Sequence, residues 1–320
     1  DNSSNLALGI AYFDNLTTGL RNIGIGIPPS YEPVFSNLTT GTNNISIGSA
    51  MNGSNSITGD YNIGIGRDGL ENISSGYENI AIGYDALDKL TTGSNNLAYG
   101  TGALNSITTS EGNVALGYYA GTSVTGGNYN VFIGYRPSDE AGNTFAPGDN
   151  NILIGYSPSI SASSADNVII GTSSGSSGSS FSNSVLLGPD TFTEASNTIV
   201  IGHNAEAVYD SMVVIGPGAG FSHSSSQGQS ILIGANSISY APQVIAIGSE
   251  SRGDNTNAIA IGEKSNAYGK NSIAIGGSGS FSTQTAAQGI QSIAIGFDAL
   301  AEYDQTIALG SYTDSRGDTT

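Results

Sequence analysis

One short phrase, apolar–x–apolar–Gly, recurs along the whole chain and constrains its fold more than any other feature. Ile259-Ala260-Ile261-Gly262, for example, is followed fourteen residues later by Ile273-Ala274-Ile275-Gly276. A repeat that runs through an entire sequence is the signature of a solenoid, in which each repeat forms one coil. The phrases end at Gly9, Gly26, Gly48, Gly66, Gly83, Gly100, Gly117, Gly134, Gly155, Gly171, Gly188, Gly202, Gly216, Gly234, Gly248, Gly262, Gly276, Gly296 and Gly310. We therefore predict a solenoid of about 19 coils.

The spacing of the phrases changes along the chain. Between Gly48 and Gly134 the interval is 18 residues once and then 17 residues four times, whereas from Gly188 onward it is mostly 14. The sequence thus predicts two parts of one continuous solenoid. Residues 1–155 form mainly 17-residue coils, and residues 156–320 form mainly 14-residue coils.

The composition predicts strands and turns rather than helices. Apolar residues are 38% of the chain, but they occur in bursts of three and never in a helical stripe, and 46 glycines separate them. Small residues three and five positions after the glycine, such as Ala205 and Ala207, predict a second short strand in each coil. The fold class is therefore all-β, a β-solenoid.

Two residue types are expected to shape the turns. We expect the glycine that ends each phrase to adopt a positive φ, where a Cβ is unfavourable. Asparagine occupies one register before the phrase in ten consecutive coils, which predicts a ladder along the stack or a turn cap. These asparagines are Asn5, Asn22, Asn44, Asn62, Asn79, Asn96, Asn113, Asn130, Asn151 and Asn167.

Net charge and the missing cysteines exclude several functions. With 8 basic and 26 acidic residues the net charge is −18, so nucleic acid is a poor candidate partner. The chain has no cysteine and hence no disulfide or thiolate metal site. No apolar run approaches the roughly 20 residues of a membrane span, so we expect no membrane insertion by this segment. Because the sequence starts at Asp1 within repeat-like residues, we expect it to be a segment of a longer protein.

The middle position of the phrase predicts a homo-oligomer. We expect the first and third residues, such as Ile273 and Ile275, to face the coil interior, and Ala274 between them to face outward. This middle residue is almost never polar, and a strand that is apolar on both faces is usually buried on both. No segment is long enough to cover the outer face locally, so a second copy is expected to do so. The bulky middle residues predicted to form this interface, and to widen the spacing at the oligomer axis, are Phe132, Leu153, Ile169, Leu186, Val200, Val214 and Leu232.

These repeats resemble those of known surface fibres. The NSIAIG phrase at 14-residue spacing, with its small residues, resembles the head repeats of YadA-like trimeric autotransporter adhesins, most strongly from Gly188 to Gly310. The 17-residue unit, as in GYDALDKLTTGSNNLAYG, is similar to repeats of phage tail fibres and related bacterial surface fibres. The resemblance implies a left-handed parallel β-roll and a homotrimer with its apolar strands against the threefold axis. It also implies an extracellular place, on a virion tail fibre or a bacterial cell surface.

Four longer intervals are the best candidates for binding. They lie between Gly26 and Gly48, Gly134 and Gly155, Gly216 and Gly234, and Gly276 and Gly296. Solenoids carry function in such insertions, and aromatic rings stack on sugars or anchor protein contacts. The candidate binding residues are Tyr31, Phe35, Tyr135, Phe145, Phe221 and Phe281. The alternative is that these rings cap the roll or pack against a neighbouring chain.

No catalytic, cofactor or metal site is predicted. His203 and His223 are the only histidines, and neither has a partner at metal-ligand spacing. The acidic groups Asp139-Glu140 and Asp298, Glu302 and Asp304 lack the calcium-binding pattern of other β-solenoids. No nucleophile motif or phosphate loop is present, so we expect no enzyme.

The leading hypothesis is a trimeric fibre or adhesin segment that attaches to a cell-surface glycan or protein receptor. The alternative is a passive rod whose binding tip lies outside this segment. A fibre that cleaves carbohydrate is a third hypothesis, for which the sequence offers no clear pair of carboxylates.

Overall fold

The structure is a computed structural model that describes residues 4–9, 13, 15–26, 35, 37–51, 53, 55–138, 146–176, 180–221, 228–278 and 284–315. Contacts divide the chain into two compact units, unit 1 (residues 1–173) and unit 2 (residues 174–320). The described residues form strands and turns without a helix, and they therefore include no helix that could cross a membrane. The predicted all-β solenoid is confirmed. Its handedness, and the division at residue 155 within one continuous solenoid, stay predictions.

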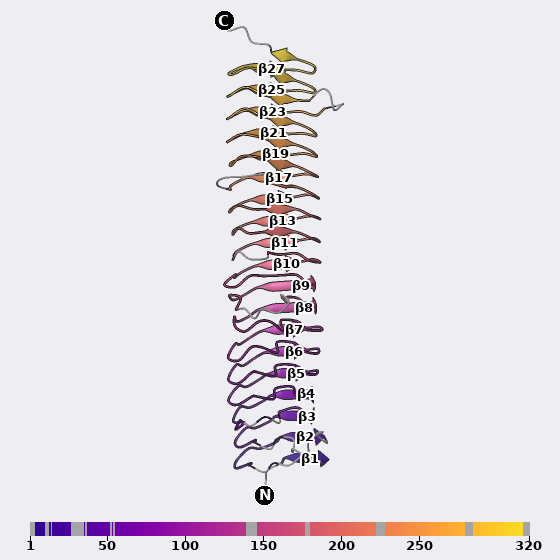
Figure 1. The fold of residues 1–320 in the computed structure, drawn as a ribbon, viewed down its shortest axis with the longest axis vertical. Coiled ribbons are helices and arrows are strands. Elements are labelled where there is room, and N and C mark those ends of the chain that lie inside the picture. The colour runs from indigo at the N-terminus through magenta and orange to yellow at the C-terminus, as the bar shows by residue number, and fades with distance from the viewer. Residues whose placement is uncertain are drawn as a thin grey trace. The chain divides into compact units, whose positions relative to one another are not determined.

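Each phrase in unit 1 forms one strand of a parallel sheet (Figure 1). Neighbouring strands pair residue for residue: Ile80 pairs with Leu97, and Ala81 with Ala98. Equivalent residues of successive coils therefore stack on one another. The strands are β1 (Leu6–Gly9), β2 (Ile23–Gly26), β3 (Ile45–Ser49), β4 (Ile63–Arg67), β5 (Ile80–Ile82), β6 (Leu97–Tyr99), β7 (Val114–Leu116), β8 (Val131–Tyr135), β9 (Ile152–Tyr156) and β10 (Val168–Ile170).

Unit 2 has a second set of strands in addition to those of the phrase. The phrase strands are β11 (Val185–Leu187), β13 (Ile199–Ile201), β15 (Val213–Ile215), β17 (Ile231–Ile233), β19 (Ile245–Ile247), β21 (Ile259–Ile261), β23 (Ile273–Ile275), β25 (Ile293–Ile295) and β27 (Ile307–Leu309). The second set is β12 (Phe192–Thr193), β14 (Glu206–Ala207), β16 (Gly220–Phe221), β18 (Ile238–Ser239), β20 (Arg252–Gly253), β22 (Asn266–Ala267), β24 (Ala286–Ala287), β26 (Leu300–Ala301) and β28 (Asp314–Ser315). The strands of both sets pair in parallel with their equivalents one coil away, for example Gly253 with Ala267, except that β14 and β16 are not paired and divide the second set into two sheets.

The expectation of two strands in every coil is therefore correct for unit 2 and wrong for unit 1. Outside the phrase strands, the described part of unit 1 holds only isolated bridge residues, such as the pair Leu38 and Ile57. In its 17-residue coils the stretch after the glycine forms turns, and its larger residues, such as Leu87 and Leu90, point inward with no exposed surface. The three additional residues allow turns that carry bulk into the core.

The predicted positive φ is confirmed for the phrase glycines other than Gly26 and Gly171, and the asparagine ladder is confirmed. Gly262 has a φ of 126°, and a Cβ there would lie 1.9 Å from the carbonyl oxygen of Gly276 in the next coil. The asparagine ladder is buried from Asn22 onward. The backbone N–H of Asn96 donates to Oδ1 of Asn79 over 3.0 Å, and Nδ2 of Asn96 donates to the carbonyl oxygen of Ser110 over 2.9 Å. These bonds satisfy polar groups at a corner that is closed to water.

The predicted orientation of the phrase is wrong. The middle residue, such as Ala98 or Ala274, has no exposed surface in the single chain, whereas the first and third residues point outward and are partly exposed. The seven residues predicted to contact a second chain all have an exposed fraction of 0%, and they are Phe132, Leu153, Ile169, Leu186, Val200, Val214 and Leu232. They form the core of the coils and are not available to a second chain, so they do not widen an oligomer axis.

The reason is the small cross-section of a coil. Ala260 shares the interior of a 14-residue coil with Ser265 and Ala267, and all three are completely buried. Two isoleucines pointing inward from the same strand would overfill this space, because protein cores are already close-packed. Bulk in the middle position is instead balanced within the coil. Phe132 is accommodated by Gly121, where a Cβ would lie 3.0 Å from the phenylalanine ring.

The core position of Phe132 predicts the effect of truncating it. Phe132→Ala leaves a cavity inside the coil and should lower the free energy of unfolding by about 3–5 kcal/mol. Denaturant unfolding measures this loss. Light scattering should give Phe132→Ala the same mass as the unmodified protein. A reduced mass with unchanged unfolding would contradict the core position and restore the interface assignment.

Candidate functional site

The outward face of the phrase strands is the most extensive candidate site. We define it as the first and third residues of each phrase, which are Ile, Leu or Val in every described coil apart from Tyr99. Their side chains remain partly exposed, as at Ile170 (39%) in unit 1 and Ile199 (40%) in unit 2. Because equivalent residues stack, each unit presents an uncharged strip two side chains wide. Apolar strips of this kind mark surfaces that contact another protein.

The sequence contains the signal for this face, but the predicted orientation of the strand is the reverse of the observed one. Two β-branched residues flank a residue that is often Gly, Ala or Ser, as in Ile63-Gly64-Ile65. Alternation places the two isoleucines on one face and the small residue on the other, and it is compatible with either face being the core. Only the width of the coil shows that the small residue belongs inside.

Two of the six predicted binding aromatics, Phe35 and Tyr135, have side chains among the described residues. Phe35 has no exposed surface and stacks on Phe13 with 5.7 Å between the ring centroids, so its predicted binding role is wrong. Phe221 lies in β16, but its side chain is outside the described residues, as are Tyr31, Phe145 and Phe281. Their binding roles stay predictions.

Tyr135 belongs to a stack rather than to an insertion loop. It is the last residue of β8, and its ring lies between those of Tyr118 and Tyr156, with centroids 5.4 and 5.0 Å away and ring planes within 16° of parallel. Both faces of the Tyr135 ring are covered, so it presents its edge and hydroxyl to solvent. This arrangement stabilises neighbouring coils and does not offer a flat face to a sugar.

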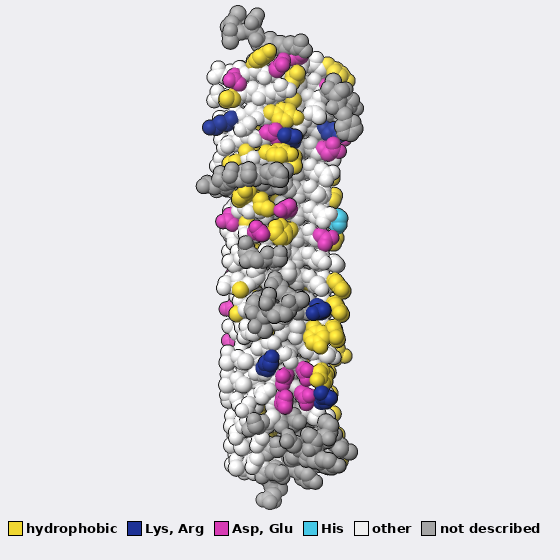
Figure 2. All heavy atoms as spheres, viewed as in Figure 1, with side chains coloured by type: hydrophobic (Ala, Val, Ile, Leu, Met, Phe, Trp, Pro, Cys, Tyr) yellow, Lys and Arg dark blue, Asp and Glu magenta, His cyan; other side chains and the backbone are white. Residues whose placement is uncertain are grey.

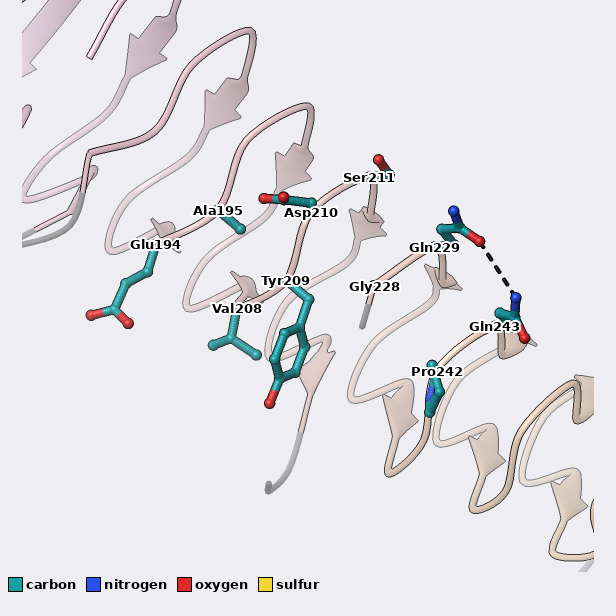
Figure 3. A pocket seen from close by; sticks show the side chains of 10 residues that line it. All are labelled: Glu194, Ala195, Val208, Tyr209, Asp210, Ser211, Gly228, Gln229, Pro242 and Gln243. Atoms are coloured by element: carbon teal, nitrogen blue, oxygen red, sulfur yellow. Dashed lines mark hydrogen bonds between the residues drawn. The ribbon is translucent and has the colours of Figure 1, made fainter. Parts of the chain in front are cut away.

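A notch in unit 2 is the clearest cavity that the described residues line (Figure 3). Its volume is about 540 Å³. It lies beside the Gly216–Gly234 interval, where the spacing is 18 residues instead of the regular 14. The longer interval interrupts the regular spacing, and the backbone at Gly228 lies so close to Asp210 that no Cβ fits there. The notch is lined by Glu194, Ala195, Val208, Tyr209, Asp210, Ser211, Gly228, Gln229, Pro242 and Gln243.

The lining of the notch combines rings with polar groups. Figure 3 shows the side chains of Tyr209 and Pro242 on coils before and after the interruption, with Gln229 and Gln243 joined at the adjoining corner. Asp210 is held in place because its Oδ1 accepts a bond from the backbone N–H of Ser196 over 2.8 Å. No Lys or Arg lines the notch. A ligand ring that carries several hydroxyl groups and no negative charge matches this lining. The carboxylates can accept hydrogen bonds from its hydroxyls, and the amides can both accept and donate them.

Acidic side chains gather at the level of β4 and β5 (Figure 2). Burial and the neighbouring Asp88 carboxyl raise the pKa of Glu71 to about 7, from an ordinary 4.5. Burial and Asp88 also raise the pKa of Asp85. Arg67 lies beside this group, with its Nε 3.0 Å from Oδ2 of Asp68. These carboxyls repel one another, so in the folded state Glu71 keeps until about pH 7 a proton that the unfolded chain releases near its ordinary pKa of 4.5.

The raised pKa of Glu71 predicts how stability changes with pH. The folded state binds this proton more tightly, so the stabilisation is complete below the ordinary pKa and is lost as pH rises through about 7. We expect Glu71→Gln, which removes the titration, to reduce the loss of unfolding free energy between pH 5 and pH 8. Urea unfolding of both proteins at these two pH values measures the difference. Identical pH dependence in both proteins would show that Glu71 does not titrate in this range.

Other titratable groups do not assemble a metal site among the described residues. His203 has its Nε2 3.6 Å from Oδ2 of Asp190 on the preceding coil, a pair that the sequence spacing did not suggest. His223, Asp139 and Glu140 lie outside the described residues.

A comparison with protein families finds two copies of the YadA head domain repeat, at residues 254–278 and 287–313. Both copies lie in unit 2, and they contain the phrase strands β21, β23, β25 and β27. No curated protein matches the chain.

Proposed function

From the two YadA head repeats we infer that this chain is an extracellular segment of a trimeric surface adhesin. Three copies associate side by side through their outward faces, and the assembly attaches to a receptor on a cell surface. The observation that carries this proposal is the outward face itself: every described coil presents two partly exposed side chains, almost all aliphatic, and none is charged. The number three rests on the likeness to the YadA repeats.

The energetics of the outward face favour association over many coils. Burying a Val, Leu or Ile completely contributes about 1.5–3 kcal/mol, so the third that is still exposed contributes about 0.5–1 kcal/mol. Association costs about 4–15 kcal/mol in lost freedom of motion. One coil cannot offset this cost, whereas the nine or ten phrase strands of one unit can. A long repetitive face is therefore suited to a permanent assembly.

The notch supports attachment over the alternative of a passive rod. A rod needs only regular coils, and the notch is an interruption with two carboxylates, two amides and a tyrosine around a cavity of about 540 Å³. Because its charged lining residues are acidic, we propose a neutral or amino-bearing saccharide as its ligand. We expect no cleavage of that saccharide. A tail fibre on a virion is the alternative carrier of this segment, suggested by the 17-residue coils of unit 1.

The association is tested by the mass in solution. Light scattering should give three times 32.3 kDa, about 97 kDa. Ile233→Asp places a carboxylate on the outward face of β17 and should lower the mass toward 32.3 kDa, since three like charges would be buried together.

The control for this variant is Ile238→Asp in β18. Ile238 is also an outward, partly exposed isoleucine, but it belongs to the second set of strands. It should leave the mass unchanged. A 32.3 kDa mass for the unmodified protein, or an equal effect of both substitutions, would rule out the outward face as the interface.

The attachment is tested by binding to an array of neutral, amino-bearing and acidic oligosaccharides. Tyr209→Ala removes the ring from the notch and should weaken binding about tenfold, equivalent to 1.4 kcal/mol. Tyr303→Ala is the matched control, because Tyr303 follows Gly296 by the same seven residues as Tyr209 follows Gly202, is 51% exposed and lies outside the notch. If the unmodified trimer and both variants bind none of the oligosaccharides, the result favours the passive rod.

A further inference from the structure

The outward face carries almost no information about position along the stack. Coils present nearly the same pair, such as Ile63 and Ile65 in β4 followed by Ile80 and Ile82 in β5. Neighbouring strands lie about 4.8 Å apart. If one copy slides along another by one coil, each aliphatic side chain again meets an aliphatic side chain, and only the contacts of the terminal coil are lost. Repetitive strands specify their register weakly for this reason.

One residue breaks the repetition. Tyr99, the third residue of its phrase in β6, is the only outward-face residue in the described coils that is not Ile, Leu or Val. It is 57% exposed, while outward aliphatic side chains on strands with a neighbour on each side reach at most 40%, at Ile199. Its neighbours in the same column are Ile82 and Leu116. The phenol thus projects from the face at one level of unit 1.

We propose that Tyr99 fixes the axial register in which copies of this chain associate, an inference that rests on the proposed trimer. In register, three Tyr99 side chains meet at one level, where the rings contact one another and the hydroxyls can pair. After a slip of one coil, each ring lies against an aliphatic residue of its neighbour, and the hydroxyl is buried without a partner. An unsatisfied buried hydroxyl and a ring forced into a gap sized for isoleucine both oppose the slipped state.

The longer intervals of the sequence leave the pairing of the phrase strands unchanged. Intervals such as Gly26–Gly48 and Gly216–Gly234 add residues between one phrase and the next in the sequence. They leave the pairing of the strands in step, as between Ile25 and Ile47. The outward face therefore has Tyr99 as its one mark within the described residues.

Symmetry gives a direct readout of the register. Three copies around a closed ring cannot all be displaced by the same step, because the steps must add to zero, so any slip breaks the threefold symmetry. In register, each isoleucine of the trimer gives one δ1-methyl resonance in an NMR spectrum of protein labelled at those methyls. In slipped trimers the outward isoleucines, such as Ile65 and Ile82, give several.

The experiment compares the unmodified protein with Tyr99→Leu, which restores the aliphatic pattern of the other coils. We expect a trimer of about 97 kDa (three times 32.3 kDa) for both, a single set of methyl resonances for the unmodified protein, and additional outward-isoleucine resonances for Tyr99→Leu. Tyr118→Leu is the control, since Tyr118 is an exposed tyrosine (47%) outside the outward face. It should keep the single set.

A second variant tests the position of the mark independently of the loss of the ring. Ile82→Tyr combined with Tyr99→Leu moves the tyrosine by one coil and should restore the single set. A Tyr99→Leu trimer with one resonance per isoleucine would overturn the assignment of register to Tyr99. A monomeric unmodified protein would instead overturn the proposed trimer.

Discussion

The structure depends on parallel pairing in which each residue of a phrase lies against its own equivalent one coil away. Ile259 pairs with Ile273, and Ala260 with Ala274. The spacing of strands in a sheet sets the rise from coil to coil, so a coil cannot expand along the stack to admit larger side chains. The interior must be filled within one layer, and the number of residues in the coil limits how wide that layer can be. Every other feature follows from this limit.

The limit on width explains how bulk is distributed. In the coil from Gly83 to Gly100, Leu87 and Leu90 fill the interior and the middle residue is Ala98. In the coil from Gly202 to Gly216 the opposite wall is Ala205 and Ala207, and the middle residue is Val214. The corner before the phrase differs as well. Unit 1 closes it with buried asparagines bonded from coil to coil, while in unit 2 the Ser272 hydroxyl donates to the Gly269 carbonyl oxygen of its own coil over 2.7 Å. Both corners accommodate longer intervals: the asparagine ladder continues across Gly134–Gly155, where the backbone N–H of Asn151 donates to Oδ1 of Asn130 over 2.8 Å.

The same limit creates the surface on which the proposed function rests. Because the middle residue takes the interior, its two larger neighbours must point outward, and a strand of the solenoid is apolar on both sides. The cavity beside Tyr209 and the single tyrosine on the outward face are departures from the repeat. A solenoid made of identical coils can stack and associate but cannot specify a ligand or a register, so these departures are where specificity can reside.

The sequence by itself determined the solenoid, its phrase strands, the positive φ of the glycines and the asparagine ladder, because each depends on local chemistry repeated at a fixed interval. It also identified the insertion beside which the notch lies. The tertiary structure alone decided which side of the strand faces inward. Alternation of side chains separates the strand into two faces but does not show which one is buried, and only the width of the closed coil excludes two isoleucines from its interior. It also decided that Phe35 is buried and that Tyr135 is covered by its neighbours. These facts depend on contacts with residues of other coils, such as Phe13, Tyr118 and Tyr156.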